Sequence, residues 1–128
     1  MHRPFPNDNL IFFGGKFMEI TNTQFKRCDI VKVIGRIDSS SAPQLMEIFN
    51  QLIDSGRYRI VFNMSDVNFI SSAGLRVLIT TQKNCKRFNR GELVLSNAPE
   101  NIKAALELAG FTTLFKIFET EVEAVGNI

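Results

Sequence analysis

Two adjacent serines, Ser71 and Ser72, stand at the predicted start of a central helix and are followed by Ala73 and Gly74. This first turn carries two hydroxyl groups and no acidic side chain, although glycine inside a helix costs up to about 1 kcal/mol relative to alanine. Unpaired N–H groups at a helix start lie at the positive end of the helix dipole and favour anions. The turn is therefore a candidate anion or partner site, and simple N-capping with close packing of the small residues is the alternative.

A second polar segment, Asp38 with the cluster Ser39, Ser40 and Ser41, follows an earlier predicted strand, and Asp66 follows the next strand. Ligands and partners bind outside the carboxyl ends of parallel strands, so we expect these side chains to form one docking edge with the serine turn. A plain turn with an N-cap explains the first segment equally well. Two carboxylates without a third ligand do not make a magnesium site, and we expect no bound metal.

The groups that nucleophilic catalysis needs are missing from the sequence. His2 is the only histidine and lies within residues 1–17, which are expected to form a loose arm, so we expect no imidazole partner for Ser72 or Cys85. No Gly-rich nucleotide motif is present. Cys28 and Cys85 lack the spacing of a zinc site and are too few for a disulfide framework, which favours reduced, structural thiols. We expect a protein that is not an enzyme and that binds no cofactor.

The composition indicates one ordinary domain, because 128 residues with 45% hydrophobic residues suffice for a single core. The 15 basic and 13 acidic residues are scattered without runs and leave a formal charge of +2, which does not favour nucleic acid as a partner. No apolar run approaches the length of a membrane span. These features predict a cytoplasmic protein with neither nucleic acid nor membrane as a partner.

Residues 1–17 contain two prolines, a Gly-Gly pair and a short apolar run, and they predict a loose N-terminal arm. They are equally explained as an extension ahead of a natural start at Met18. The patterned domain is expected over residues 18–128. It begins with strands at Thr23–Lys26 and Ile30–Ile34, which flank a tight hairpin turn.

Helix-period stretches then alternate with short apolar runs. Helices are expected around residues 45–53, 75–85, 102–109 and from about 122, and strands at 60–64, 93–95 and 114–118. The order ββαβαβαβα predicts an α/β fold. It is a single domain with a mostly parallel sheet of about five strands, an N-terminal antiparallel hairpin and about four flanking helices. Three helix starts have the spacing of a capping box: Ser41–Gln44, Asn97–Glu100 and Thr120–Glu123.

Three segments carry a family resemblance. Val33–Asp38 precedes a serine-rich helix start, Ile60–Asp66 is the next strand and its end, and Phe69–Leu75 contains a Ser-Ser-Ala-Gly-Leu element. In order and spacing they resemble the STAS domain of bacterial anti-sigma factor antagonists. The likeness spans residues 18–125, nearly the whole predicted domain.

The resemblance implies a partner-switching regulator of transcription. Unphosphorylated family members bind an anti-sigma factor that is also a serine kinase with a histidine-kinase-like ATPase fold, which frees the sigma factor. The kinase phosphorylates a serine at the start of the second helix, and a metal-dependent serine phosphatase removes the phosphate. The matching residue is Ser72. Many members carry aspartate at the position of Ser71, so a serine there departs from the family pattern, leaves the site less negative and makes Ser71 a rival acceptor. Ala73, Gly74 and Arg76 complete the implied partner-binding residues, on an expected monomer or weak dimer.

The alternative hypothesis is a protein with the same fold and a different biological role. Similar domains serve as protein-docking modules of stress-signalling or transport complexes, without a phosphorylation cycle. Stable binding to a histidine-kinase-like ATPase domain would favour the antagonist over the docking module. Nucleotide binding at the same edge is a weaker third hypothesis, which a rise in melting temperature on adding nucleotide would detect.

Overall fold

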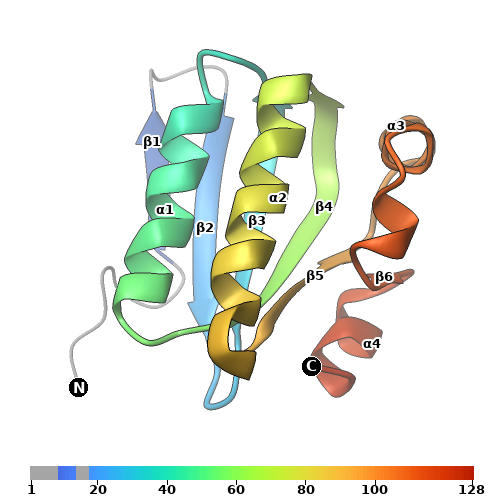
Figure 1. The fold of residues 1–128 in the computed structure, drawn as a ribbon. Helices are drawn as coiled ribbons and strands as arrows, with labels where there is room; N and C mark the ends of the chain where they lie inside the picture. The colour runs from blue at the N-terminus through green and yellow to red at the C-terminus, as the bar shows by residue number, and fades with distance from the viewer. Residues whose placement is uncertain (1–8, 14–17) are drawn as a thin grey trace.

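The computed structural model describes residues 9–13 and 18–128. In these residues one six-stranded sheet runs in the order β1-β2-β3-β4-β5-β6, antiparallel from β1 to β3 and parallel from β3 to β6 (Figure 1). The strands are β1 Asn9–Phe13, β2 Met18–Gln24, β3 Asp29–Ile37, β4 Arg59–Ile70, β5 Glu92–Ser96 and β6 Ile117–Phe118. The α-helices are α1 Ala42–Asp54, α2 Ser72–Lys86, α3 Glu100–Leu108 and α4 Glu121–Gly126, with short 3-10 helices η1 Arg87–Asn89 and η2 Phe111–Thr113.

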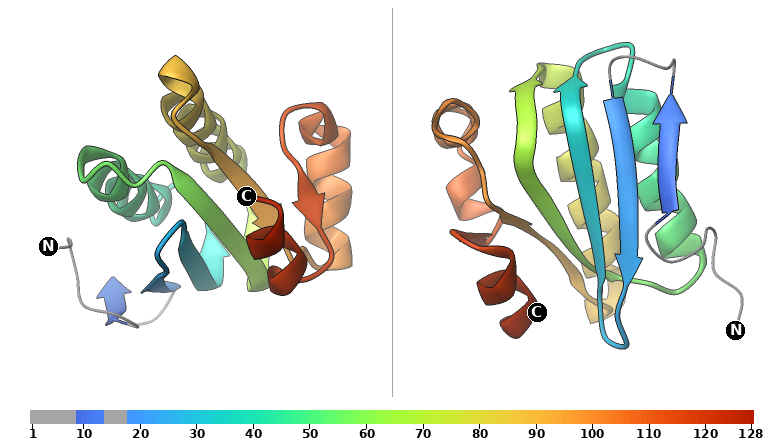
Figure 2. Two further views of the ribbon diagram at one scale, coloured as in Figure 1. Left: turned by 90° about the horizontal axis from the view of Figure 1, so that it is seen from below. Right: turned by 180° about the vertical axis from the view of Figure 1, so that it is seen from behind.

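Helices α1 and α2 lie side by side over one face of the sheet, and α4 lies against the other face near β5 and β6 (Figures 1 and 2). The main core fills the space between the sheet and the α1–α2 pair. A smaller cluster joins Ile30, Val61 and Val94 to Ala124 of α4. The central strands are therefore covered on both faces at one end, as their continuous apolar sequences predict.

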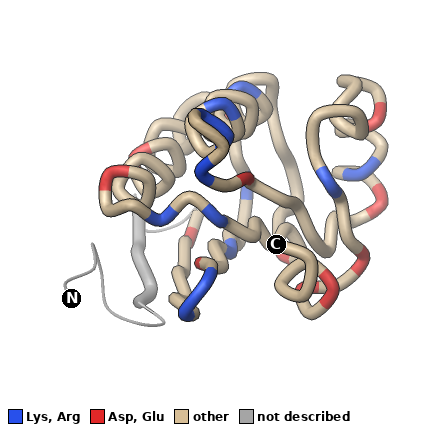
Figure 3. Tube along the Cα trace, turned by 60° about the horizontal axis from the view of Figure 1, so that its bottom comes forward, with Lys and Arg blue, Asp and Glu red and all other residues tan. Residues whose placement is uncertain are grey.

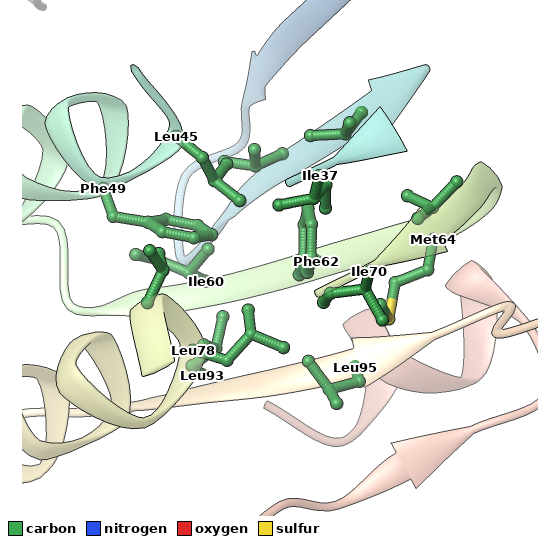
Figure 4. Packing of buried hydrophobic residues seen from close by; sticks show 14 of the residues in the cluster. Ile37, Leu45, Phe49, Ile60, Phe62, Met64, Ile70, Leu78, Leu93 and Leu95 are labelled. Atoms are coloured by element: carbon green, nitrogen blue, oxygen red, sulfur yellow. The ribbon is translucent and has the colours of Figure 1, made fainter. Parts of the chain in front are cut away.

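The main core is built by the helical stripes that the sequence predicts. Leu45 and Phe49 of α1 and Leu78 of α2 point toward the strands (Figure 4). The ring of Phe49 meets the ring of Phe62 edge to face, with centroids 5.6 Å apart. Each such buried side chain contributes about 1.5–3 kcal/mol. This packing fixes the two helices against the sheet and, with them, the helix starts that form the candidate site.

The predicted α/β fold is confirmed, with differences at both ends. Asn9–Phe13, expected within a loose arm, form edge strand β1, which pairs with β2. Residues 1–8 and 14–17 lie outside the described residues, so the division into an arm and a domain from residue 18 stays a prediction. The strand expected over residues 114–118 shrinks to β6, because Phe111 and Phe115 stack in the core around η2 instead.

One of the three predicted capping boxes is confirmed. Thr120 and Glu123 exchange both hydrogen bonds at the start of α4. The box at Ser41 is wrong because its hydroxyl donates to the carbonyl of Arg36 instead of capping α1. The box at Asn97 is also wrong. Its backbone is left-handed and its N–H donates to Phe118 O, so α3 begins only after Pro99.

Both cysteines are buried and free. Burial raises the pKa of the Cys85 thiol to about 12 and also raises that of Cys28. Both thiols are therefore protonated and unreactive at neutral pH. The expectation of structural thiols agrees with this geometry.

Candidate functional site

The starts of α1 and α2 lie at one edge of the sheet, because β3 and β4 are parallel neighbours that lead into them (Figure 1). The Ser71 N–H donates to Ile37 O at 2.8 Å, so the α2 start is joined to the end of β3. The predicted convergence of the two serine-rich turns at the carboxyl ends of the strands is thus present.

The two serines at the α2 start have different roles. Ser71 is the N-cap, and its Oγ accepts from Gly74 N at 3.3 Å. Ser72 is the first helical residue and its side chain is exposed. Within the described residues its hydroxyl has no hydrogen-bond partner. Ser72 is therefore the freer nucleophile for a phosphoryl group, whereas Ser71 already uses its oxygen in the cap.

Gly74 is buried on the side of α2 that faces the sheet, so it does not form part of an exposed surface. A Cβ at this position would lie 2.7 Å from Ile37 Cγ2 and 2.7 Å from Ile70 Cγ1. The glycine therefore allows α2 to approach the ends of β3 and β4, as in the packing interpretation of the turn. That interpretation explains Gly74 but not the free hydroxyl beside it.

The electrostatics of the α2 start favour a negative group. The first turn contains no acidic residue, and Lys83 and Lys86 complement the dipole at the other end of the helix. Arg76 follows Ser72 by four residues, so it lies one turn along on the same helix face, and it is exposed. A phosphate on Ser72 would therefore lie near a helix N-terminus and within one turn of a guanidinium group.

Asp38 organises the turn before α1. Its Oδ1 accepts from the Ser40 hydroxyl at 2.7 Å, from Ser40 N at 3.0 Å and from Ser41 N at 3.2 Å. The Ser40 hydroxyl bond is the main reason that the pKa of Asp38 lies below its ordinary value. Ser41 is buried, and its Oγ also accepts from Asp38 N. The turn of the alternative interpretation is therefore present, but the Ser41 side chain does not cap α1, and Ser39 and Ser40 remain exposed.

A largely apolar groove of about 270 Å³ runs between α1 and α2 beside the serine turn. Its described lining residues follow the same helical spacing on both sides, and among them Arg76 supplies the one charged side chain. The lining is Ser39, Ala42, Pro43 and Met46 on one side and Ala73, Arg76, Val77 and Thr80 on the other. This surface can receive an apolar segment of a partner protein next to the Ser72 hydroxyl.

Five lining residues of the groove were not predicted: Ala42, Pro43, Met46, Val77 and Thr80. The spacing i, i+3, i+4 and i+7 of positions 39–46 and 73–80 is a signal that would have found them, because it traces a second stripe beside each core-facing stripe.

Asp66 lies away from this edge. Strand β4 continues to Ile70, so Asp66 is inside the strand, and its carboxylate pairs with Lys32 at 3.2 Å. Lys32 alternates with Val31 and Val33 of the main core, which places the ion pair on the opposite face of the sheet. The structure thus brings together the Asp38 turn, the α2 start and Arg76, but not Asp66.

The side chains next to this ion pair were not predicted as a surface. The guanidinium of Arg36 lies 4.3 Å from the ring centroid of Phe69, and Ile34 and Phe69 are each more than a third exposed. Strand alternation puts Ile34 on the face of Lys32 and Arg36, opposite Val31 and Val33, and this is the signal that could have marked it as exposed.

In residues 9–13 and 18–128 no group of three or more His, Cys, Asp or Glu side chains could hold a metal ion. In the same residues no helix is both long and apolar enough to cross a bilayer.

Comparison with known proteins agrees with the geometry. The family model for the STAS domain matches residues 19–124. The anti-sigma-B factor antagonist of Staphylococcus aureus is 32% identical over 104 residues, covering 80% of this chain and 94% of that protein. BtrV of Bordetella bronchiseptica is 30% identical over 109 residues, covering 85% of this chain and 93% of that protein.

Solved structures show the same fold at lower identity. An anti-sigma factor antagonist from Mycobacterium paratuberculosis matches with a TM-score of 0.75 at 20% identity, covering 85% of this chain and 92% of that one. Unphosphorylated SpoIIAA matches with a TM-score of 0.72 at 16% identity, covering 83% and 92%. A Bacillus SpoIIAA structure in the phosphorylated form matches at 0.68 and 17% identity, covering 84% and 96%. The chain belongs to the STAS domain family, among the anti-sigma factor antagonists.

Proposed function

We propose that the unphosphorylated chain binds an anti-sigma factor that is a serine kinase, and that phosphorylation of Ser72 ends this binding. Antagonists of this family are regulatory proteins and not enzymes. The partner is expected to have a histidine-kinase-like ATPase fold, and a metal-dependent serine phosphatase returns the chain to its binding form. The cycle is assigned to the cytoplasm.

The observation that carries this proposal is the contrast between the two serines. The Ser72 hydroxyl is exposed and has no partner within the described residues, whereas the Ser71 oxygen caps α2. The groove beside Ser72 offers an apolar surface with a single guanidinium, at Arg76. The docking surface therefore consists of the exposed serine turns, the groove and Arg76, with Ser72 inside its border.

A phosphate on Ser72 is expected to leave the fold intact. A helix N-terminus stabilises such a group by about 1 kcal/mol, so the domain does not unfold. Inside a docked interface the same group costs several kcal/mol through desolvation. Phosphorylation of Ser72 therefore blocks the docking surface and leaves the fold unchanged.

The test is binding of the purified serine-kinase anti-sigma factor from the same genome, measured by calorimetry without ATP. Ser72→Ala should bind as tightly as the unchanged chain. Ser72→Asp should bind at least about 100-fold more weakly, which corresponds to about 3 kcal/mol. Asn89→Asp is the matched control, because it adds the same charge at an exposed position beyond the far end of α2. Equal binding of Ser72→Asp and the control would contradict the proposal.

No binding to any such kinase would favour the alternative role as a docking module of a stress-signalling or transport complex without a phosphorylation cycle. In that case the groove should still capture a partner, but Ser72→Asp would have no specific effect.

A further inference from the structure

The end of the molecule opposite the serine turn is strongly basic. Three connections meet there: the β2–β3 hairpin turn, the loop between α1 and β4, and the end of α2 with η1 (Figure 1). Lys and Arg segments gather across this end, whereas Asp and Glu are frequent along α3 and α4 (Figure 3). Eight of the chain's 15 Lys and Arg residues belong to it: Lys26, Arg27, Arg57, Arg59, Lys83, Lys86, Arg87 and Arg90. We call these residues the basic end.

Two adjoining hollows form the surface of the basic end. Their volumes are about 310 Å³ and 300 Å³, and Arg59 and Arg90 line both of them. Six of the eight cations line one hollow or the other. Among the described residues that line the hollows, Glu92 has the one carboxylate side chain, and it already pairs with Lys116 at 3.2 Å. The hollows therefore form a continuous positive surface.

Two arginines hold the three connections together. Arg57 donates to the buried carboxylate of Asp29 at 2.6 Å and also to hairpin carbonyls, among them Cys28 O at 3.2 Å. Arg90 lies 3.9 Å from the ring centroid of Tyr58 and donates to Asn84 O at 2.8 Å. These contacts within the protein preorganise the surface of the basic end.

Other cations at this end are not neutralised by the protein. Within the described residues neither Arg59 nor Lys86 has an ion pair, and the same holds for Lys26 and Arg27. Since all four are more than a third exposed, their charge is available to an anionic partner.

Exposed aromatic rings accompany these charges. Phe88 is 82% exposed and has a left-handed backbone with φ of 58°, which a bulky residue rarely adopts. The guanidinium groups of Arg87 and Arg90 lie 5.9 Å and 5.8 Å from its ring centroid. Phe25 in the hairpin turn is 46% exposed. Apolar rings therefore project from two separate connections among the cations.

We propose that the basic end binds the surface of a membrane that contains anionic phospholipids. Its cations contact headgroup phosphates, while Phe25 and Phe88 enter the headgroup region. Clustered Lys and Arg with exposed aromatic rings are the features of proteins that lie on anionic membranes without crossing them. The sequence predicted no membrane partner because the cations are dispersed along the chain and gather only in the fold.

The position of the rings favours a membrane over single-stranded nucleic acid. A binding site for single-stranded nucleic acid has aromatic side chains inside a basic groove, and successive bases stack on their faces. Neither Phe25 nor Phe88 lines a hollow, and the face of Tyr58 is covered by Arg90. The basic end is also separated from Ser72 by the length of α2, about 22 Å for 15 residues. Membrane attachment therefore leaves the groove and Ser72 open to a partner.

The test is co-sedimentation of the full chain with vesicles of phosphatidylglycerol and phosphatidylcholine, and with vesicles of phosphatidylcholine alone. Binding is expected only to the anionic vesicles and should weaken as salt is added. The double variant Arg59→Gln with Lys86→Gln should bind about 25-fold more weakly, at about fivefold for each cation.

The second variant removes a ring. Phe88→Asn should weaken vesicle binding about tenfold, and asparagine tolerates the left-handed backbone, so the fold is kept. Leu108→Asn is the matched control, because Leu108 is 90% exposed on α3, outside the basic end. This variant should bind vesicles as tightly as the unchanged chain. Circular dichroism checks that each variant is folded.

Absence of binding to anionic vesicles would overturn the proposal. So would equal losses in Phe88→Asn and Leu108→Asn. Tight binding of a labelled single-stranded oligonucleotide without vesicle binding would also overturn it and assign the basic end to nucleic acid.

Discussion

Replacing Gly74 with alanine tests whether the α2 start is shaped by close packing on the sheet. The added Cβ would lie 2.7 Å from a side-chain carbon of Ile37 and 2.7 Å from one of Ile70. Carbon atoms pack favourably only at about 3.5–4.0 Å. Both isoleucines are buried at the ends of β3 and β4, so neither can move away freely.

Two opposing effects set the magnitude. Overpacking a core costs about 1–3 kcal/mol. Alanine in place of glycine in a helix returns about 1 kcal/mol. The difference between the two effects should lower the free energy of unfolding of Gly74→Ala by up to about 2 kcal/mol, with a fall in melting temperature of about 4 °C for each kcal/mol.

Urea denaturation followed by circular dichroism measures this change. Gly126→Ala is the matched control, because Gly126 is also helical and a Cβ there has nothing within 4 Å. The control should not lower the free energy of unfolding, because alanine replaces a helical glycine there without a clash and returns up to about 1 kcal/mol. A more stable Gly74→Ala protein would refute the packing argument and show that glycine is present for another reason.

Three further predictions concern polar side chains other than Ser72. The pKa of Asp38 is lowered in the fold, so its stabilisation is present above the ordinary pKa of 3.8 and disappears as pH falls through the lowered value. Asp38→Asn should therefore be less stable at pH 7 and equal to the unchanged chain in strong acid, as pH-dependent urea unfolding will check. Gln82→Leu should cost about 3 kcal/mol in thermal or urea unfolding, because the Leu93 N–H and the Leu114 carbonyl both lose their bonds to the buried amide. Cys85, whose thiol has a pKa of about 12 through burial, should react with a thiol reagent at pH 8 only after the protein unfolds, and rapid reaction in the native state would contradict its burial.

The parts of the fold that follow from local periodicity were predicted well. The stripe Leu45, Phe49 and Leu52 is buried on α1, and the hairpin near Cys28 joins β2 to β3. The Thr120 capping box depends only on residues three apart, and it is present. Such features need no knowledge of distant contacts, which is why the sequence is sufficient for them.

Features that depend on tertiary contacts were missed. The Ser41 hydroxyl bonds to the end of β3 instead of capping α1, because the Asp38 turn competes for it. Among the described strands, β1 pairs with β2 alone, and its short sequence carries no alternation that stands out. Phe115 packs against Phe111 in the core. A short apolar run can be buried as a strand or as a helical turn, so the sequence of residues 114–118 does not show which one forms.

The candidate site divides in the same way. Ser72 and Ser71 could be found from sequence because a helix start is a local signal, but their different roles could not. Only the hydrogen bond from Gly74 N shows which hydroxyl is used in the cap. The α1–α2 groove and the basic end depend on how separate segments come together, so no local pattern contains them.

The central claim is that Ser72 is the phosphorylated residue. Intact-mass and peptide mass spectrometry would be applied to the chain after incubation with ATP and a lysate of its own source cells, beside Ser72→Ala and Ser71→Ala. We expect one added phosphate that maps to Ser72 and is lost only in Ser72→Ala. A phosphate on Ser71 that persists in Ser72→Ala, or none in any sample while the kinase phosphorylates another substrate, would contradict it.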